Sequence, residues 1–89
     1  MKKNNNRKGS FFVYMVRCRY GTYYTGSTGD LEQRIALHNS GKGARYLRGR
    51  SPVTLVYSKK CRSRNDALRA ERAIKMLKRS EKEALIKRL

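Results

Sequence analysis

Two side chains in one predicted helix have the chemistry to handle an anion and a proton. His38, the only histidine of the chain, follows Arg34 by four residues. Their helical stripe also contains Leu31 and Ile35, which should face a core and place the guanidinium and the imidazole at its edge. Arg34 is suited to neutralising negative charge, and His38 to moving a proton or orienting water. The structural alternatives are an ion pair of Arg34 with Asp30 and a hydrogen-bonded histidine at a helix end.

A carboxylate lies in a second predicted helix. Glu71, one of only six acidic residues, borders an apolar stripe whose members are Ala67, Ala70, Ile74 and Leu77. Cleavage of a phosphodiester needs at least one such carboxylate to hold Mg²⁺ beside the phosphate. The alternative for Glu71 is an ordinary helical ion pair with Lys75, four residues later.

Two tyrosines, Tyr14 and Tyr24, lie ten residues apart on two short predicted strands. Surrounding cations stabilise a phenolate and lower its pKa, so a basic pocket would let a tyrosine act as a general base. The alternative is a pair of core aromatic residues. A four-residue loop that pairs Cys18 with Tyr23 would put the two rings on opposite faces of the sheet. A shared site therefore predicts a bulge, or a loop of three or five residues.

The charge of the chain points to a polyanionic partner. Its 89 residues contain 23 Lys and Arg against 6 Asp and Glu, a net charge of +17. This excess costs stability through self-repulsion, which nucleic acid would relieve. The densest basic loop mixes cations, glycines and a tyrosine, and its predicted nucleic-acid contacts are Lys42, Arg45, Tyr46, Arg48 and Arg50. No predicted helix has a basic face opposite a strong Trp, Phe and Leu face, so a membrane partner is not expected.

Length and composition predict one small domain at residues 11–89, preceded by a disordered basic leader at residues 1–10. No apolar run of about 18 residues is present to span a membrane, and the basic start has no signal-peptide cleavage site. Cys18 and Cys61 are too few for a zinc site or a disulfide scaffold. They are expected to be free thiols in a reduced, cytosolic setting.

The order of elements predicts an α+β fold. Strands are expected at residues 11–16, 23–25 and 53–57, and helices at 30–39, 67–79 and 81–89. Asp30 and Gln33 have the spacing of a capping box for the first helix, and Gly41 is expected to end it. Ser80 and Glu83 have the same spacing at the last helix. The order β-β-α-loop-β-α-α predicts a small three-stranded, largely antiparallel sheet flanked by helices.

Five segments resemble the GIY-YIG nuclease superfamily in their order and spacing. They are Val13–Met15, Tyr24–Gly26, residues 26–39, residues 41–47 together with 52–57, and Ala70–Lys75. The first two resemble the paired motifs, the third the family's helix with its Arg and His, and the last its metal-ligand helix. The loop and third strand are similar to small stand-alone bacterial members. Relatives include the nuclease domain of the excinuclease C subunit and the catalytic domains of homing endonucleases. The resemblance covers residues 11–79.

The resemblance implies a phosphodiester hydrolase that uses one divalent metal, Mg²⁺ or Mn²⁺. Tyr14 would be the base or water-activating phenol, and Tyr24 would form a hydrogen bond in the same site. Arg34 would stabilise charge on the phosphate, and His38 would be an auxiliary base or water-orienting group. Glu71 would bind the metal. These roles match the needs of phosphoryl chemistry.

By analogy with these relatives, the expected substrate is branched, nicked or damaged DNA, in repair or recombination, with RNA left open. The chain is expected to be a monomer, and its specificity would come from a partner protein or from DNA shape. Phe12 replaces the glycine of the first motif, Ser27 replaces a lysine of some relatives, and no Asn follows Asn65. These departures favour an alternative, a catalytically weak or inactive nucleic-acid-binding module. A ribosome- or RNA-associated basic protein is a third hypothesis.

Overall fold

Residues 10–88 are described by a computed structural model, in which three strands form one antiparallel sheet. The middle strand is β1 (Phe11–Arg17), flanked by β2 (Tyr23–Thr28) and β3 (Thr54–Cys61). Helices accompany the sheet, so the predicted α+β fold and its element order are confirmed. The predicted disordered leader falls almost entirely on residues 1–9, outside the described residues.

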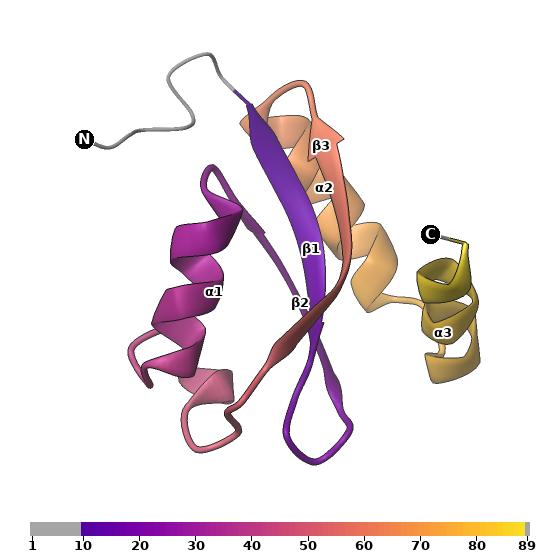
Figure 1. Cartoon of the computed structure of the whole chain (residues 1–89). Helices are drawn as coiled ribbons and strands as arrows, with labels where there is room; N and C mark the ends of the chain where they lie inside the picture. The colour runs from indigo at the N-terminus through magenta and orange to yellow at the C-terminus, as the bar shows by residue number, and fades with distance from the viewer. Residues whose placement is uncertain (1–9, 89) are drawn as a thin grey trace.

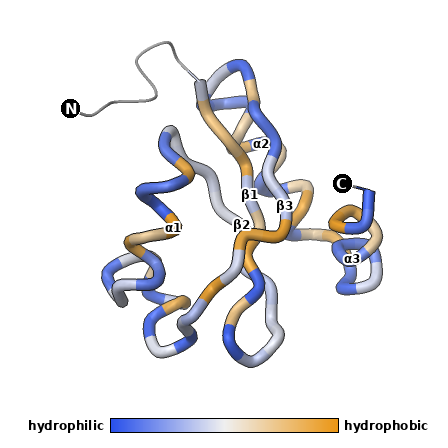
Figure 2. Tube along the Cα trace, in the orientation of Figure 1, coloured by the Kyte–Doolittle hydropathy of each residue, from blue (hydrophilic) through white to orange (hydrophobic). Residues whose placement is uncertain are grey.

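The helices cover the two faces of the sheet. Helix α1 (Leu31–Asn39) lies on one face, and α2 (Arg64–Lys75) and α3 (Arg79–Lys87) lie on the other (Figure 1). Residues 13–16 of β1 are all buried, as expected for a strand covered on both sides. Figure 2 shows hydrophobic colours along much of β1, whereas hydrophilic and hydrophobic colours alternate along α1. The core is therefore two thin layers separated by β1.

Alternation along β1 divides the core. Tyr14 and Val16 pack with residues of α1 and the basic loop, whereas Val13 and Met15 pack with Ile74 of α2. Even-numbered residues of this part of β1 therefore point to the α1 face, and odd-numbered residues point to the α2 face. This places Tyr14 under α1 and away from the apolar contacts of α2.

The register of β1 and β2 brings Tyr14 and Tyr24 to one face. Arg17 pairs with Tyr23, so five residues, 18–22, connect the two strands. Tyr14 then lies opposite Gly26, and Tyr24 lies opposite Val16. Because directly paired residues share a face, both phenols point toward α1. The predicted odd-length loop is confirmed.

Helix α1 forms as its sequence predicts. The Asp30 carboxylate accepts a hydrogen bond of 3.1 Å from the Gln33 N–H and caps the first turn. Beyond the last turn, Gly41 adopts φ +84°, a conformation that glycine allows freely. The helix residues that avoid full exposure are Leu31, Arg34, Ile35 and His38. The stripe predicted from spacing is therefore the stripe that faces the sheet.

Several predicted boundaries were wrong. Strand β2 continues through Gly26 to Thr28, and β3 extends to Cys61. The basic loop contains a short 3₁₀ turn, η1 (Arg45–Leu47), because Leu47 is drawn into the core and is 1% exposed. Both cysteines are free, as expected.

The C-terminal helices also differ from prediction. Helix α2 begins after Ser63, whose side chain accepts from the Asp66 N–H, but it ends at Lys75 instead of near residue 79. Helix α3 starts earlier than expected because Glu81, and not Glu83, forms the cap. The Glu81 carboxylate accepts from the Lys78 N–H at 2.8 Å. None of the helices in residues 10–88 has the length and apolar character needed to cross a bilayer.

Candidate active site

Tyr14 and His38 form the centre of the candidate site. A buried hydrogen bond of 2.8 Å joins Oη of Tyr14 to Nε2 of His38. Tyr14 is 2% exposed and His38 is 1% exposed, so bulk water does not compete for this contact. Tyr14 comes from the middle of β1, and His38 comes from the last turn of α1. Two residues 24 positions apart are therefore held as one polar pair inside the core.

Tyr24 and the basic loop border this pair through aromatic contacts. The Tyr24 ring meets the His38 ring edge-on, with centroids 5.7 Å apart. Tyr24 also stacks with Tyr46 of η1, at a centroid distance of 5.9 Å. The Arg50 guanidinium lies 4.4 Å from the centre of the Tyr46 ring, and its Nε donates to the Tyr46 carbonyl at 2.7 Å. Tyr46 and Arg50, predicted as nucleic-acid contacts, thus adjoin the predicted catalytic residues.

The charges of Arg34 and Glu71 act on Tyr14. Burial raises the pKa of Tyr14 above the usual phenol range, and the charge of Tyr24 acts in the same direction. Arg34 lowers this pKa, and Glu71 raises it. Because loss of hydration outweighs the guanidinium, the lowering expected from surrounding cations is not the net result. Tyr24, Arg34 and Glu71 nevertheless all lie within electrostatic range of Tyr14.

The Arg34 side chain is half-buried on α1, and its charge acts on the site. The ion pair with Asp30 that the sequence allowed is not among those formed within residues 10–88. The Asp30 carboxylate instead caps the helix through the Gln33 N–H. Arg34 is half-buried on the stripe that ends at His38, and its positive charge lowers the pKa of His38. The guanidinium therefore lies within electrostatic range of the Tyr14–His38 pair.

Glu71 has the donor chemistry for a divalent cation, although it forms an ion pair in this structure. Its Oε2 atom lies 2.7 Å from Nζ of Lys75, the helical pair that the sequence allowed. The Glu71 side chain is 17% exposed and that of Lys75 is 52% exposed, so the long ammonium side chain has room to move away. Within residues 10–88, His, Cys, Asp and Glu side chains form no cluster of three or more. One carboxylate still fits Mg²⁺, which completes its shell with water and phosphate oxygens.

Comparison with known proteins decides the family. A family model described as the GIY-YIG catalytic domain matches residues 10–84, most of the chain. The chain belongs to the GIY-YIG family. Membership in this nuclease domain family indicates nuclease function, and the predicted resemblance is confirmed.

The GIY-YIG domain is similar to curated proteins and solved structures. It is 52% identical over 73 residues to a UPF0213 protein of Halobacterium salinarum, covering 82% of this chain and 95% of that protein. A UPF0213 protein of Streptococcus pneumoniae is 45% identical over 75 residues, covering 84% of this chain and 76% of that protein. The solution structure of UPF0213 protein BH0048 from Bacillus halodurans has a TM-score of 0.57 at 44% identity, with 88% of this chain and 83% of that chain covered. Protein EF2693 from E. faecalis has a TM-score of 0.61 at 36% identity, covering 98% and 88% respectively.

Gly26 gives the Tyr14 ring its place in this GIY-YIG domain, a role that the sequence analysis missed. A Cβ atom on Gly26 would lie 2.6 Å from Oη and 2.8 Å from Cζ of Tyr14. Gly26 lies within β2, one residue beyond the end predicted for this strand. The available signal was a glycine between strand-forming residues, which often marks a close approach.

The substitution Gly26→Ala is expected to lower the free energy of unfolding by about 1–3 kcal/mol, the usual cost of overpacking a core. The buried Tyr14 ring cannot retreat without breaking its hydrogen bond to His38. Urea denaturation measures the change. Ser27→Ala, one residue along the same strand, is the control and should change stability much less. Equal stability of the two variants would contradict this account of Gly26.

The buried His38 predicts an acid-sensitive fold. Burial lowers the pKa of His38 from its ordinary value of 6.5, and Arg34 lowers it further. Between the two pKa values the unfolded chain binds the proton and the folded chain does not, so stability rises with pH there. The contribution is complete above 6.5 and is lost as the pH falls. Acidification from about pH 7.5 to about pH 5 should lower the free energy of unfolding, measured in urea, more for the parent than for His38→Gln. If the parent and the variant lose the same stability, His38 is not the cause of the acid sensitivity.

The remaining predicted nucleic-acid contacts lie on the surface around η1. Lys42, Arg45 and Arg48 are exposed, and Arg50 is half-buried over Tyr46. Tyr46 is 44% exposed, so part of its surface is available to a partner. The GIY-YIG domain thus presents cations next to the Tyr14–His38 pair, although the loop is folded onto the core rather than free.

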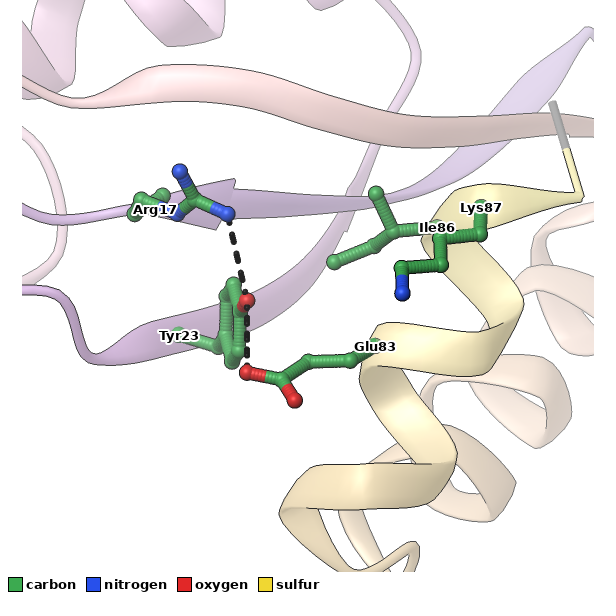
Figure 3. Close-up of a pocket in the computed structure, with 5 residues that line it drawn as sticks. All are labelled: Arg17, Tyr23, Glu83, Ile86 and Lys87. Carbon is green, nitrogen blue, oxygen red and sulfur yellow. Dashed lines mark hydrogen bonds between the residues drawn. The ribbon is translucent and has the colours of Figure 1, made fainter.

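On the other face of the sheet, side chains that line a pocket connect α3 to β1 and β2 (Figure 3). It is lined by Arg17, Tyr23, Glu83, Ile86 and Lys87. The Tyr23 hydroxyl donates to Glu83 at 3.4 Å and accepts from Arg17 at 3.3 Å. Arg79 donates to the same Glu83 carboxylate at 3.1 Å. The polar side chains of this pocket form hydrogen bonds with one another. None of the predicted catalytic residues lines it.

Proposed function

We propose that this GIY-YIG domain is a divalent-metal-dependent endonuclease that hydrolyses phosphodiester bonds in DNA. The observation that carries the proposal is the buried Tyr14–His38 pair, with the Tyr24 ring against His38 and the Arg34 charge within electrostatic range. Glu71 acts electrostatically on the same phenol from α2. These groups are the proton-handling, charge-neutralising and metal-binding side chains that phosphodiester hydrolysis requires.

In the proposed reaction, the Tyr14 oxygen receives a proton from the attacking water. The water oxygen bonds to phosphorus while the bond from phosphorus to the leaving ester oxygen breaks. Because burial raises the pKa of Tyr14, the resting side chain is a neutral phenol. It must first lose its own proton to a base in the solvent before it can accept the proton of the attacking water, and the leaving ester oxygen takes a proton from solvent. Arg34 neutralises the charge that develops on the phosphate, and Tyr24 orients groups in the same site.

Glu71 would hold one Mg²⁺ or Mn²⁺ ion after releasing Lys75. When bound, such an ion supplies Lewis-acid stabilisation of the charge on the phosphate oxygens. The negative charge of Glu71 raises the pKa of Tyr14 in the free protein. Neutralising this carboxylate would remove that effect and make the Tyr14 proton easier to lose.

The exposed cations around η1 would bind the DNA backbone, so affinity should fall as salt increases. We propose that sequence specificity is low and that DNA shape or a partner protein selects branched, nicked or damaged sites. A role in repair or recombination, a monomeric state and a cytoplasmic setting belong to the same proposal. The free Cys18 and Cys61 thiols support the cytoplasmic setting.

Cleavage of labelled duplex, flap and four-way-junction DNA with Mg²⁺ or Mn²⁺ tests this function. The parent should cut at least one of these substrates, and chelation of the metal should stop the reaction. Cleavage that persists in chelator would contradict the metal dependence. The same assay on single-stranded and duplex RNA determines whether DNA is preferred.

A nucleic-acid-binding module without catalysis is the second candidate. Two observations favour it. Lys75 occupies the carboxylate of Glu71 that would bind the metal, and the raised pKa of Tyr14 keeps its phenol protonated and unable to act as a base. This alternative predicts salt-sensitive DNA binding with no cleavage in any metal. It also predicts that substitutions of Glu71 leave DNA binding unchanged.

A further inference from the structure

The loop after α1 packs its backbone against the His38 ring. A Cβ atom on Gly43 would lie 2.9 Å from both Cα and Cε1 of His38, closer than real side chains approach. The chain reaches this position because α1 ends in a tight turn. The Lys42 N–H donates to the Leu37 carbonyl at 3.0 Å, and the Gly41 N–H donates to the His38 carbonyl at 3.2 Å. The helix end therefore fixes where the loop meets the imidazole.

The next residue makes a directional contact with the ring. The Ala44 N–H donates to Nδ1 of His38 at 3.3 Å. A backbone amide can only donate, so Nδ1 must present its lone pair. Burial and Arg34 lower the pKa of His38, which keeps the ring neutral near pH 7. A neutral imidazole with a lone pair on Nδ1 carries its proton on Nε2, the atom that faces Tyr14.

We propose that the Gly43–Ala44 backbone fixes His38 in its Nε2–H tautomer, so that His38 is a hydrogen-bond donor to Tyr14 and not a base for it. Gly43 and Ala44 are then positioning residues for the Tyr14–His38 pair. In the 2.8 Å contact, Nε2–H then donates and Tyr14 Oη accepts, a direction that follows from the Ala44 bond to Nδ1. The phenolic proton consequently points away from the histidine.

The donor assignment gives separate roles in catalysis to Nε2 of His38 and Oη of Tyr14. These roles rest on the proposed function. The Nε2–H group stabilises negative charge on the Tyr14 oxygen in the reaction. Because Nε2 holds a proton already and Nδ1 is engaged by Ala44, the proton of Tyr14 leaves toward the substrate side. The sequence analysis allowed His38 to be an auxiliary base, and the donor assignment replaces that role.

Nuclear magnetic resonance on the full chain tests the tautomer without any substrate. His38 is the only histidine of the chain, so its ring signals need no further assignment. A long-range ¹H–¹⁵N correlation of the labelled protein at about pH 7.5 distinguishes the two neutral tautomers and the charged ring. The expected pattern has a protonated Nε2 and an unprotonated Nδ1. A protonated Nδ1, alone or in a charged ring, would overturn the proposal even if the protein cuts DNA.

Two loop variants test the positioning role. Gly43→Ala should displace the ring from Ala44 and produce a mixture of tautomers, whereas Ala44→Gly keeps the N–H and should retain the Nε2–H pattern. The backbone amide spectrum verifies that each variant is folded. If Gly43→Ala folds and keeps the parent pattern, the loop does not set the tautomer. Where cleavage is observed, Gly43→Ala should lower kcat about 10-fold or more with little change in KM, as expected for lost positioning.

Discussion

Replacing Glu71 with glutamine is expected to lower metal-dependent DNA cleavage by about 1,000-fold, equivalent to about 4 kcal/mol of transition-state stabilisation. Glutamine keeps the size of the side chain but removes the negative charge that a divalent cation needs. DNA binding in the absence of metal should be retained, because Glu71 repels phosphate rather than attracting it. Single-turnover cleavage and fluorescence anisotropy measure the two quantities separately.

Two matched variants separate a metal ligand from a structural carboxylate. Glu32→Gln makes the same change of charge at an exposed position in the first turn of α1 and should leave cleavage unchanged. Lys75→Gln breaks the ion pair from its other end. A helical pair with this i, i+4 spacing contributes on the order of 0.5 kcal/mol to stability, so its loss alone does not unfold the domain or abolish activity. Lys75→Gln should therefore retain cleavage, and it should need less metal for half-maximal rate.

The contrary result is equally clear. If Glu71→Gln and Lys75→Gln lose the same fraction of activity, the ion pair itself is what matters and Glu71 is not a metal ligand. If Glu71→Gln cuts DNA as fast as the parent at every metal concentration, the proposed metal site is wrong. Saturating Mg²⁺ should not restore the variant, because the missing group is the ligand.

The elements of the site could be predicted because each depends on local patterns. Helical spacing placed Leu31, Arg34, Ile35 and His38 on one stripe, and in the structure His38 is buried and the other three are partly buried. The Asp30 cap and the Gly41 stop were also local signals and were confirmed. Periodicity is a short-range property of the chain, so it survives in the folded protein.

The contacts between elements could not be predicted in the same way. Spacing gave no means of knowing that the Ala44 N–H meets Nδ1 of His38 or that Gly26 lies against the Tyr14 ring. The direction of the Tyr14 pKa was also wrong, because net charge was evident in the sequence whereas burial was not. The start of α3 was misplaced because Ser80 and Glu83 have the spacing of a capping box, whereas in the structure Glu81 caps the Lys78 N–H.

Replacing Tyr14 with phenylalanine is expected to lower cleavage by about 100- to 10,000-fold, the range associated with loss of general acid–base catalysis. The substitution removes one oxygen atom and leaves the ring in its place under α1. It also leaves Nε2 of His38 without its 2.8 Å partner, so the free energy of unfolding should fall by about 1–3 kcal/mol. Cleavage must therefore be measured where urea denaturation shows the variant to be fully folded.

Tyr57→Phe provides the matched control on the other side of the sheet. Tyr57 lies in β3 and packs with the α2 side of the core, so loss of its hydroxyl should leave cleavage unchanged. The pH profile gives a second criterion. Because burial raises the pKa of Tyr14, the parent rate should still rise with pH above neutrality, as more of the phenol can lose its proton. The residual rate of Tyr14→Phe should lack this rise. A variant that keeps both the parent rate and the parent profile would remove Tyr14 from the chemistry and leave it as a core residue that anchors His38.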